Sequence, residues 1–340
     1  MSGAPPATES SSPTVSTPSA SEADETHGAA GLAFVRRDET LFGQVYVVDE
    51  GGATRQLTQL DPTIHTGGAQ SVAWSPDGER LAFAYGPSVT AGLGIIDADG
   101  GEALMVAGGF YAWSPDGSRL ATGEMLDVAP PEAMNSLVVR VVNPRTGDAE
   151  EVGRGVLRGW HPDGERIVVV RARGASDSSP GVPQLVLVST VDGTETDLLP
   201  GALEARWSPD GIRVAYALEE PECGPSCSRI LIDSAGASQT IEIDNGVDPV
   251  WSADGRRLAY FAFGGVAAEL KVVDLVTGET IGLGPATHPI AWSPEGHIAT
   301  AAHSDELGQM VIRIFDVESG QLVAAVPGQA PSWRPVMDGP

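Results

Sequence analysis

From Gly31 onward, the chain alternates short apolar runs with turns rich in Gly, Pro and Asp. The runs "RLAFA", "RIVVV" and "RVAYA" are typical, and others such as "LKVVD" and "IRIFD" alternate apolar with polar residues. Runs of this length, rich in Val, Ile and Leu and bounded by turn residues, predict antiparallel β-strands. No stretch shows the periodicity of a long helix. The pattern therefore predicts an all-β fold.

The strands belong to a repeated unit that is marked by tryptophan. All 7 Trp residues of the chain fall in one local pattern of the type "WSPDG", in which Trp is followed by a turn and then by a second strand. Successive Trp residues are about forty residues apart, which is the length of one four-stranded propeller blade. The positions are Trp74, Trp113, Trp160, Trp207, Trp251, Trp292 and Trp333.

The two ends of the repeat region are incomplete units that complement each other. Gly31 to Thr58 supplies three strands without a preceding Trp strand, and Gln329 to Pro335 supplies a Trp strand with no strand after it. Joining them makes a seventh blade and removes the open sheet edges that invite aggregation. We therefore predict a single seven-bladed β-propeller over residues 31–335, closed by pairing of its N- and C-terminal strands, with a short tail at 336–340.

The first 30 residues have a different composition, dominated by Ser, Thr, Pro, Ala and acidic residues. Such a segment buries too little apolar surface to offset the entropy of ordering, so we expect a disordered tether. It contains no signal peptide. A Ser/Thr/Pro tether before a compact domain is what remains of a processed lipoprotein, and we expect a lipid anchor upstream of Met1. An ordinary cytoplasmic N-terminus is the alternative.

The repeated motif resembles a known family. "WSPDGxxLAF" followed by "xIxVxDxxG" is similar to the TolB-type, WD-like β-propeller repeat, and the resemblance covers residues 31–335. It implies the propeller fold, whereas members of this group range from periplasmic scaffolds to peptidase side domains and lyases. TolB domains have six blades, so the predicted count of seven sets this chain apart from them. The Tol–Pal partner role is therefore not carried over.

The repeated turn residues are predicted to be structural. Pro presets the turn, Asp caps backbone N–H groups and Gly takes the positive φ angle, and a catalytic residue would not need a copy in nearly every blade. The Trp side chains are expected to pack between blades. "DADG" at residues 97–100 lacks the downstream Glu of a calcium loop. Nothing in the sequence explains why Arg334 follows Trp333, where five other blades have Ser.

Charge restricts the partners. The formal net charge is −26, with 46 acidic and 20 basic residues, and a nucleic-acid partner would need clustered Lys and Arg. No apolar run approaches the roughly 18 to 20 residues of a membrane helix. We expect a monomer that binds a protein, a peptide or an envelope polysaccharide, with no nucleic acid, no membrane span and no cofactor.

Function is expected where the repeat is broken, in the loops of one rim. The long loops there are Gln59 to Gln70, Gly123 to Asn135, Ala172 to Gln184 and Glu219 to Cys227. Cys223 and Cys227 are the only cysteines, and two ligands are too few for structural zinc. We expect them to form a disulfide, which indicates an oxidising compartment; a redox or metal role is the alternative.

Two groups of residues are candidates for binding. Arg158, Glu204, Arg206 and Asp248 shortly precede Trp residues, and we expect them near the central channel. His65, His288 and His303 fall on loops assigned to the rim. Within the resemblance, oligogalacturonate lyases use a His-rich metal site in the channel, which makes these histidines the candidate site of a metal-dependent enzyme.

The sequence favours a non-catalytic binding or scaffold propeller that recognises a protein, a peptide or a cell-envelope polymer through its loop-bearing rim. We expect it to lie outside the cytoplasm, attached to the cell envelope or secreted. A metal-dependent polysaccharide lyase and a purely structural envelope assembly partner are the alternatives. The G-x-S-x-G motif of propeller-associated hydrolases does not occur.

Overall fold

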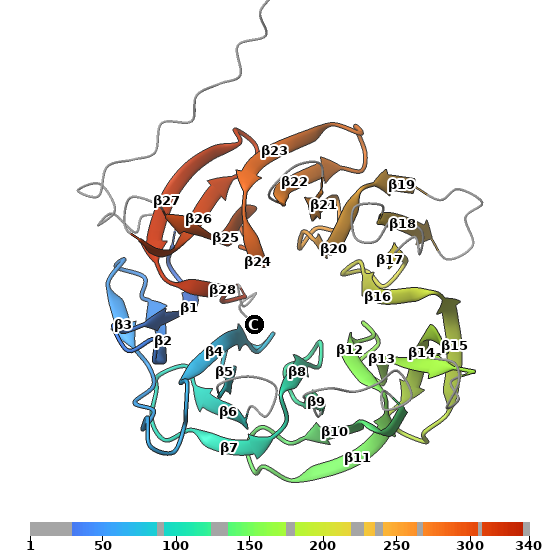
Figure 1. Cartoon of the computed structure of the whole chain (residues 1–340), viewed down its shortest axis with the longest axis horizontal. Coiled ribbons are helices and arrows are strands. Elements are labelled where there is room, and N and C mark those ends of the chain that lie inside the picture. The colour runs from blue at the N-terminus through green and yellow to red at the C-terminus, as the bar shows by residue number, and fades with distance from the viewer. Residues whose placement is uncertain are drawn as a thin grey trace, which may run out of the picture.

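The chain folds into seven four-stranded antiparallel sheets arranged around a central axis (Figure 1). The computed structural model describes residues 29–86, 92–123, 135–174, 181–218, 228–234, 241–263, 268–304 and 308–335. The predicted all-β, seven-bladed propeller is confirmed. The tether and the short C-terminal tail lie outside the described residues, apart from Ala29 and Ala30, so their disorder stays a prediction. No helix within the described ranges is long and apolar enough to cross a membrane.

Six of the blades use four consecutive strands each, ordered from the axis outward. Blade 1 consists of β4 (Ala69–Trp74), β5 (Arg80–Tyr85), β6 (Gly92–Asp97) and β7 (Leu104–Ala107). Blade 2 consists of β8 (Phe110–Trp113), β9 (Leu120–Gly123), β10 (Val138–Val142) and β11 (Ala149–Arg154). Blade 3 consists of β12 (Val156–Trp160), β13 (Arg166–Arg173), β14 (Val182–Ser189) and β15 (Glu195–Pro200).

The remaining consecutive blades follow the same order. Blade 4 consists of β16 (Ala202–Trp207), β17 (Arg213–Leu218), β18 (Arg229–Ser234) and β19 (Ile241–Asp244). Blade 5 consists of β20 (Gly246–Trp251), β21 (Arg257–Ala262), β22 (Glu269–Asp274) and β23 (Thr280–Pro285). Blade 6 consists of β24 (Thr287–Trp292), β25 (His297–Ser304), β26 (Gln309–Asp316) and β27 (Gln321–Pro327).

Blade 7 closes the ring from both ends of the chain. Its innermost strand is β28 (Gln329–Trp333), followed outward by β1 (Leu32–Arg37), β2 (Gly43–Val48) and β3 (Thr54–Gln56). Leu32 pairs with Trp333 in the antiparallel register of these strands. In Figure 1 the red β28 therefore lies beside the blue β1. The predicted closure is confirmed, and it leaves no innermost strand without a partner.

The tryptophans join neighbouring blades, as predicted. The indole N–H of Trp160 donates to the carbonyl oxygen of Ala112 at 2.9 Å, and that of Trp251 donates to the carbonyl oxygen of Arg206 at 2.8 Å. In both pairs the acceptor precedes the Trp of the previous blade. Trp74 and Trp251 are only 7% and 8% exposed. The rings of Trp160 and Trp251 therefore lie between blades with their polar atoms hydrogen-bonded, whereas the buried indole nitrogen of Trp333 has no hydrogen-bond partner among the described residues.

Arginine side chains on several of these rings form a second link between blades. Arg213 of blade 4 lies over the ring of Trp251 of blade 5, with its guanidinium carbon 4.9 Å from the ring centroid, and donates to the carbonyl oxygen of Gly255 at 2.6 Å. Arg119 of blade 2 makes the same contacts with Trp160 and Gly164 of blade 3. Cation–π stacking combined with a hydrogen bond stabilises each blade pair.

The structure explains Arg334. In blades 2 and 4, the arginine that stacks on the Trp of the next blade directly precedes the second-strand residue that pairs with the Trp of its own blade. In blade 7 the residue at the corresponding position is Gly31, so no arginine is available there. Arg334 supplies the missing guanidinium from the opposite end of the chain. It lies 5.1 Å from the ring centroid of Trp74 and donates to the carbonyl oxygen of Gly78 at 3.1 Å. Arg334 therefore restores, at the ring closure, the arginine–tryptophan contact that is seen between other blades.

The Pro-Asp-Gly turns are structural, as predicted. Asp77 accepts hydrogen bonds from the Ser75 hydroxyl and, at 3.0 Å, from the backbone N–H of Glu79. The same arrangement recurs at Asp116, Asp210 and Asp254. The Ser114 hydroxyl, followed by that of Ser118, lowers the pKa of Asp116 to about 2. Each of these aspartates therefore accepts hydrogen bonds within its own turn.

These turns are expected to make the protein acid-sensitive. The pKa values of Asp116, Asp210 and Asp254 lie below the ordinary value of 3.8, so their contribution to stability is complete above that pH and is lost as pH falls through the folded-state values. We expect the free energy of unfolding, measured with urea, to fall between about pH 4 and pH 2. Ser114→Ala should flatten this decrease, and an unchanged pH profile for that variant would contradict the assignment.

The antiparallel topology divides the molecule into two faces. The connections between second and third strands emerge on the same face as those between blades, because strand direction alternates within each sheet. We name this the loop face. The Pro-Asp-Gly turns and the hairpins between third and fourth strands emerge on the opposite face, the turn face. Residues at the start of each innermost strand therefore lie toward the loop face.

Candidate functional site

The four charged candidates come from the innermost strands of three neighbouring blades. Arg158 lies on β12, Glu204 and Arg206 lie on β16, and Asp248 lies on β20. Each of these strands has a β-bulge in its pairing with the second strand; Arg158 and Asp248 lie within bulges, and Glu204 directly follows one. A bulge leaves a residue unpaired and re-aims its side chain. The bulges therefore turn Arg158, Glu204 and Asp248 away from the regular strand alternation, whereas Arg206 is regularly paired near the end of β16.

The side chains of this group interact with one another. Arg206 forms an ion pair with Glu204, and its Nη1 donates to the backbone carbonyl oxygen of Arg158 at 3.1 Å. Glu204 is also hydrogen-bonded to Asp248. Asp248 in turn lies 3.2 Å from Nε2 of His288, which is on β24 of the next blade. We name these five residues the channel group: Arg158, Glu204, Arg206, Asp248 and His288.

Burial dominates the electrostatics of the channel group. The side chain of Glu204 is 14% exposed, and burial, with the Asp248 carboxylate adding to it, raises its pKa against the opposing effect of Arg206. A raised pKa means that burial disfavours the charged form of the Glu204 carboxyl group. Burial also lowers the pKa of Arg158.

Two features of the channel group are energetically costly without a ligand or a solvent partner. The buried Nε of Arg158 has no hydrogen-bond acceptor among the described residues. A buried donor without an acceptor costs free energy, which an acceptor on a ligand or a solvent molecule relieves. Asp248 has a φ angle of 51°, in the left-handed region, where strained residues are enriched at functional sites. Both features point to recognition of a polar group at this position.

The rest of the channel wall carries different chemistry. The hydroxyl of Tyr111 on β8 lies 3.1 Å from the Ser71 hydroxyl on β4, and burial raises the pKa of the tyrosine. These innermost strands belong to blades 1 and 2, whereas the channel group comes from blades 3 to 6. Sequence reasoning missed this pair, although Tyr111 stands two residues before a Trp, as Arg158 does.

The three predicted rim histidines do not converge. His288 joins the channel group and its ring lies 4.3 Å from that of Phe261. His65, in the connection between blades 7 and 1, lies edge-on to Tyr85 with the ring centroids 5.0 Å apart. His303, at the loop-face end of β25, lines a cavity of about 610 Å³ with Arg36 and Arg37 of blade 7. The histidines therefore have separate neighbours.

Other predicted features lie in parts of the chain outside the described residues. Cys223 and Cys227 lie outside the described residues, as do most of the three long loops between second and third strands. The disulfide therefore stays a prediction. Within the described ranges, no three His, Cys, Asp or Glu side chains come close enough together to hold a metal ion.

Comparisons with known proteins find similarity of structure alone. No family model and no curated protein matches the sequence. TolB from Acinetobacter baumannii is 16% identical with a TM-score of 0.55, over 90% of this chain and 82% of that chain. An oligogalacturonate lyase from Vibrio parahaemolyticus is also 16% identical, with a TM-score of 0.60, over 85% and 92% of the two chains. Kuenenia stuttgartiensis hydrazine synthase is 15% identical with a TM-score of 0.56, over 76% and 86%.

At this identity the similarity concerns architecture, because one fold supports unrelated functions. The predicted resemblance to TolB-type propellers is confirmed at that level. The chain is a seven-bladed β-propeller, similar in structure to TolB and to oligogalacturonate lyase.

Proposed function

We propose that this protein is a non-catalytic binding propeller that recognises a protein or peptide through its loop face, with the channel group holding a polar group of the ligand. The observation that carries the proposal is the buried Nε of Arg158, which lacks an acceptor within the described chain. A carbonyl or carboxylate oxygen of a ligand supplies that acceptor once the Arg158 side chain turns to expose Nε.

The surrounding fold supports recognition without chemistry. The channel group is held by bulges of innermost strands, which are rigid elements of a closed ring, so its side chains are positioned before the ligand arrives. Its Arg and acidic side chains balance one another. A metal site built from the three rim histidines is not favoured, because His65 lies against Tyr85 of blade 1 and His303 lines a cavity with Arg36 and Arg37 of blade 7, whereas His288 pairs with Asp248.

Selection of peptides against the whole chain tests the proposal. Peptides selected on the wild-type protein from a random library should bind Arg158→Met and Glu204→Gln at least roughly tenfold more weakly, as measured by fluorescence polarisation. Arg145→Gln is the matched control, because Arg145 is 62% exposed and lies on the turn face. Equal binding to all three variants would overturn the role of the channel group. Release of unsaturated products from polygalacturonate, in the presence of divalent metals, would instead support the lyase alternative.

We further propose an extracytoplasmic location. The support is the Ser/Thr/Pro-rich composition of the first 30 residues and the C-x3-C pair in a protein with no other cysteine. A peptide or an exposed protein segment is then the expected ligand, and an envelope polysaccharide is the alternative. Fractionation of cells that produce the native protein checks the location, and recovery in the cytoplasm would contradict it.

A further inference from the structure

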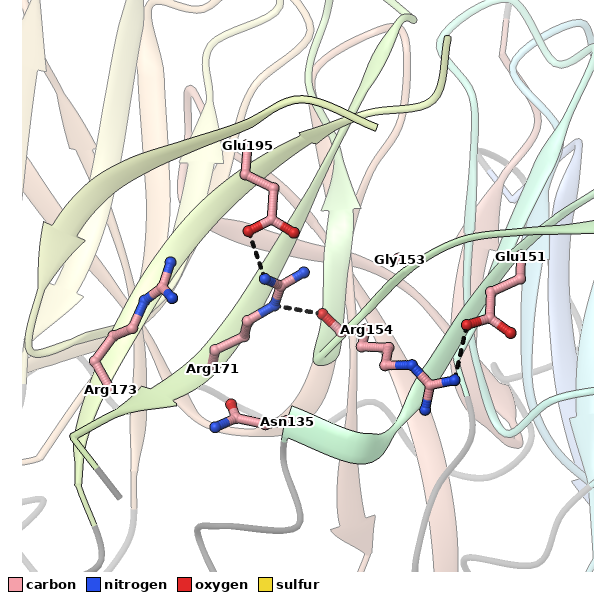
Figure 2. Close-up of a pocket in the computed structure, with 7 residues that line it drawn as sticks. All are labelled: Asn135, Glu151, Gly153, Arg154, Arg171, Arg173 and Glu195. Atoms are coloured by element: carbon pink, nitrogen blue, oxygen red, sulfur yellow. Dashed lines mark hydrogen bonds and ion pairs between the residues drawn. The ribbon is translucent and has the colours of Figure 1, made fainter. Parts of the chain in front are cut away.

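A second cluster of charged side chains lies at the junction of blades 2 and 3, away from the channel group. Arg154 ends β11, whereas Arg171 and Arg173 alternate along the end of β13 and so share one face of that strand. They line a cavity of about 420 Å³, a size typical of small-ligand sites. In Figure 2, Arg171 lies between Arg173 and Arg154. Three of only 20 basic residues gather here in a chain of net charge −26.

Arg171 is the anchored member of this cluster. Its side chain is 13% exposed; Nε donates to the carbonyl oxygen of Arg154 at 2.6 Å, and Nη1 donates to Glu195 at 2.6 Å (Figure 2). Its other terminal nitrogen, Nη2, has no acceptor in the described part of the chain. The guanidinium group is therefore held in a fixed orientation with donors left over, which is the arrangement that binds an oxyanion.

A glycine keeps the space in front of Arg171 open. A Cβ atom at Gly153 would lie 3.2 Å from Cγ1 of Val188 and 3.9 Å from Nη2 of Arg171. Asn135 fixes the neighbouring backbone, because its amide both donates to the carbonyl oxygen of Ala172, at 2.8 Å, and accepts from its N–H, at 3.0 Å. The cavity is therefore bounded by positioned backbone, with access to the unused donors of Arg171.

The outer two arginines have partners that can exchange. Arg173 pairs with Asp197 and Arg154 pairs with Glu151, at 2.7 and 3.0 Å, and all four side chains are 46% to 56% exposed. Exposed ion pairs contribute little to stability, so a ligand carboxylate can replace an internal one at small cost. Within the protein, the three arginines already pair with carboxylates, namely those of Glu151, Glu195 and Asp197.

We propose that the cleft between blades 2 and 3 binds a carboxylate group, with Arg171 as the fixed contact and Arg154 and Arg173 as exchanging ones. The carboxylate comes from a small organic acid or from an acidic side chain of a bound peptide. This site is separate from the channel group, so it does not depend on the function proposed above. The overall negative charge of the protein repels anions, so binding is expected to be weak and to weaken further with salt.

The test uses the full chain with two probes. Glutarate represents a free organic acid, and acetyl-tetraglutamate amide represents acidic side chains, with acetyl-tetraglutamine amide as the uncharged control peptide. Binding is followed through the NMR signals of arginine Nε–H groups and by isothermal titration calorimetry at low salt. We expect the Arg171 signal to shift with at least one acidic probe. With the tetraglutamine peptide we expect neither a shift of this signal nor heat of binding.

The variants separate a specific site from a general charge effect. Arg171→Gln and the double variant Arg154→Gln/Arg173→Gln should each weaken binding at least roughly tenfold. The double variant removes only exposed side chains, so it keeps the test valid if Arg171→Gln disturbs folding. Gly153→Ala should also weaken binding, with no change of charge. The control Arg145→Gln removes an equally paired arginine on the turn face and should leave binding unchanged.

Each outcome of this test supports or overturns the proposed carboxylate site. Binding of glutarate assigns a free organic acid as the ligand class, whereas binding of the tetraglutamate peptide alone assigns an acidic protein segment. Failure of both probes, or equal weakening by Arg145→Gln and the cleft variants, overturns the proposal. Arg158→Met should not affect either probe, so a failure at the channel group and a failure at this cleft are distinguishable.

Discussion

Trp74→Ala is expected to lower the free energy of unfolding by about 3–5 kcal/mol, as measured by urea unfolding at neutral pH. Trp74 belongs to an apolar cluster that contains residues of both blade 7 and blade 1, so the substitution leaves a cavity at the ring closure. Its indole N–H donates to the carbonyl oxygen of Gly31 at 3.0 Å, and its backbone N–H donates to the Ser332 hydroxyl at 3.1 Å. Trp74 therefore links both ends of the propeller, through its ring to Gly31 and through its backbone to Ser332.

Two further substitutions separate the contributions at this position. Trp74→Phe keeps most of the apolar area and removes the indole hydrogen bond, so it should cost about 0.5–1.5 kcal/mol from that bond plus a smaller packing loss. Arg334→Ala removes the stacked guanidinium group and should cost about 1–2 kcal/mol. Arg145→Ala, at an exposed turn, should be nearly neutral. If Trp74→Ala were no more destabilising than Arg145→Ala, the closure would not depend on this contact.

Gly43→Ala is expected to destabilise the same seam by at least about 1–3 kcal/mol. Gly43 on β2 forms an isolated bridge with Gly68, in the connection that leads into blade 1. An added Cβ would overlap the carbonyl oxygen of Ala69 and lie 3.1 Å from Cγ1 of Val35. Because the obstructing atom is backbone, the two segments must separate to make room. Urea unfolding at neutral pH measures the loss.

Gly282→Ala is the matched control for this prediction. Gly282 also lies within a strand, β23, but the atom that an added methyl group would meet there is the carboxylate of Glu269. That side chain is 45% exposed and can swing into solvent, so we expect little change in stability. A cost for Gly282→Ala equal to that of Gly43→Ala would show that both effects come from strand propensity and not from the close approach of blades 7 and 1.

The fold could be predicted from the sequence because each blade repeats the same local sequence pattern. The Trp, the Pro-Asp-Gly turn and the strand after it recur with a period of about forty residues, and the partial units at the two ends complete one blade. Every one of these features acts over a short range of sequence. Arg334 is the instructive exception, because it restores a contact with Trp74 that is 260 residues away in the chain.

The candidate site was only partly predictable. That Arg158, Glu204, Arg206 and Asp248 lie near the axis follows from their spacing to Trp, but their pairing with one another does not. The bulges that re-aim them depend on how each innermost strand pairs with the second strand. His288 was grouped with His65 and His303 as a rim residue, whereas the structure joins it to Asp248.

By itself, the sequence of this protein determined the architecture: seven blades, their strand order, the closure of the ring and the structural role of the repeated Asp and Trp residues. These follow from strand periodicity, turn chemistry and repetition. Only the tertiary structure decided which side chains meet between blades, namely the channel group, the Arg334 contact and the three-arginine cleft of blades 2 and 3. Such contacts join residues of different blades, and their geometry depends on strand bulges and on the space that a residue such as Gly153 leaves open.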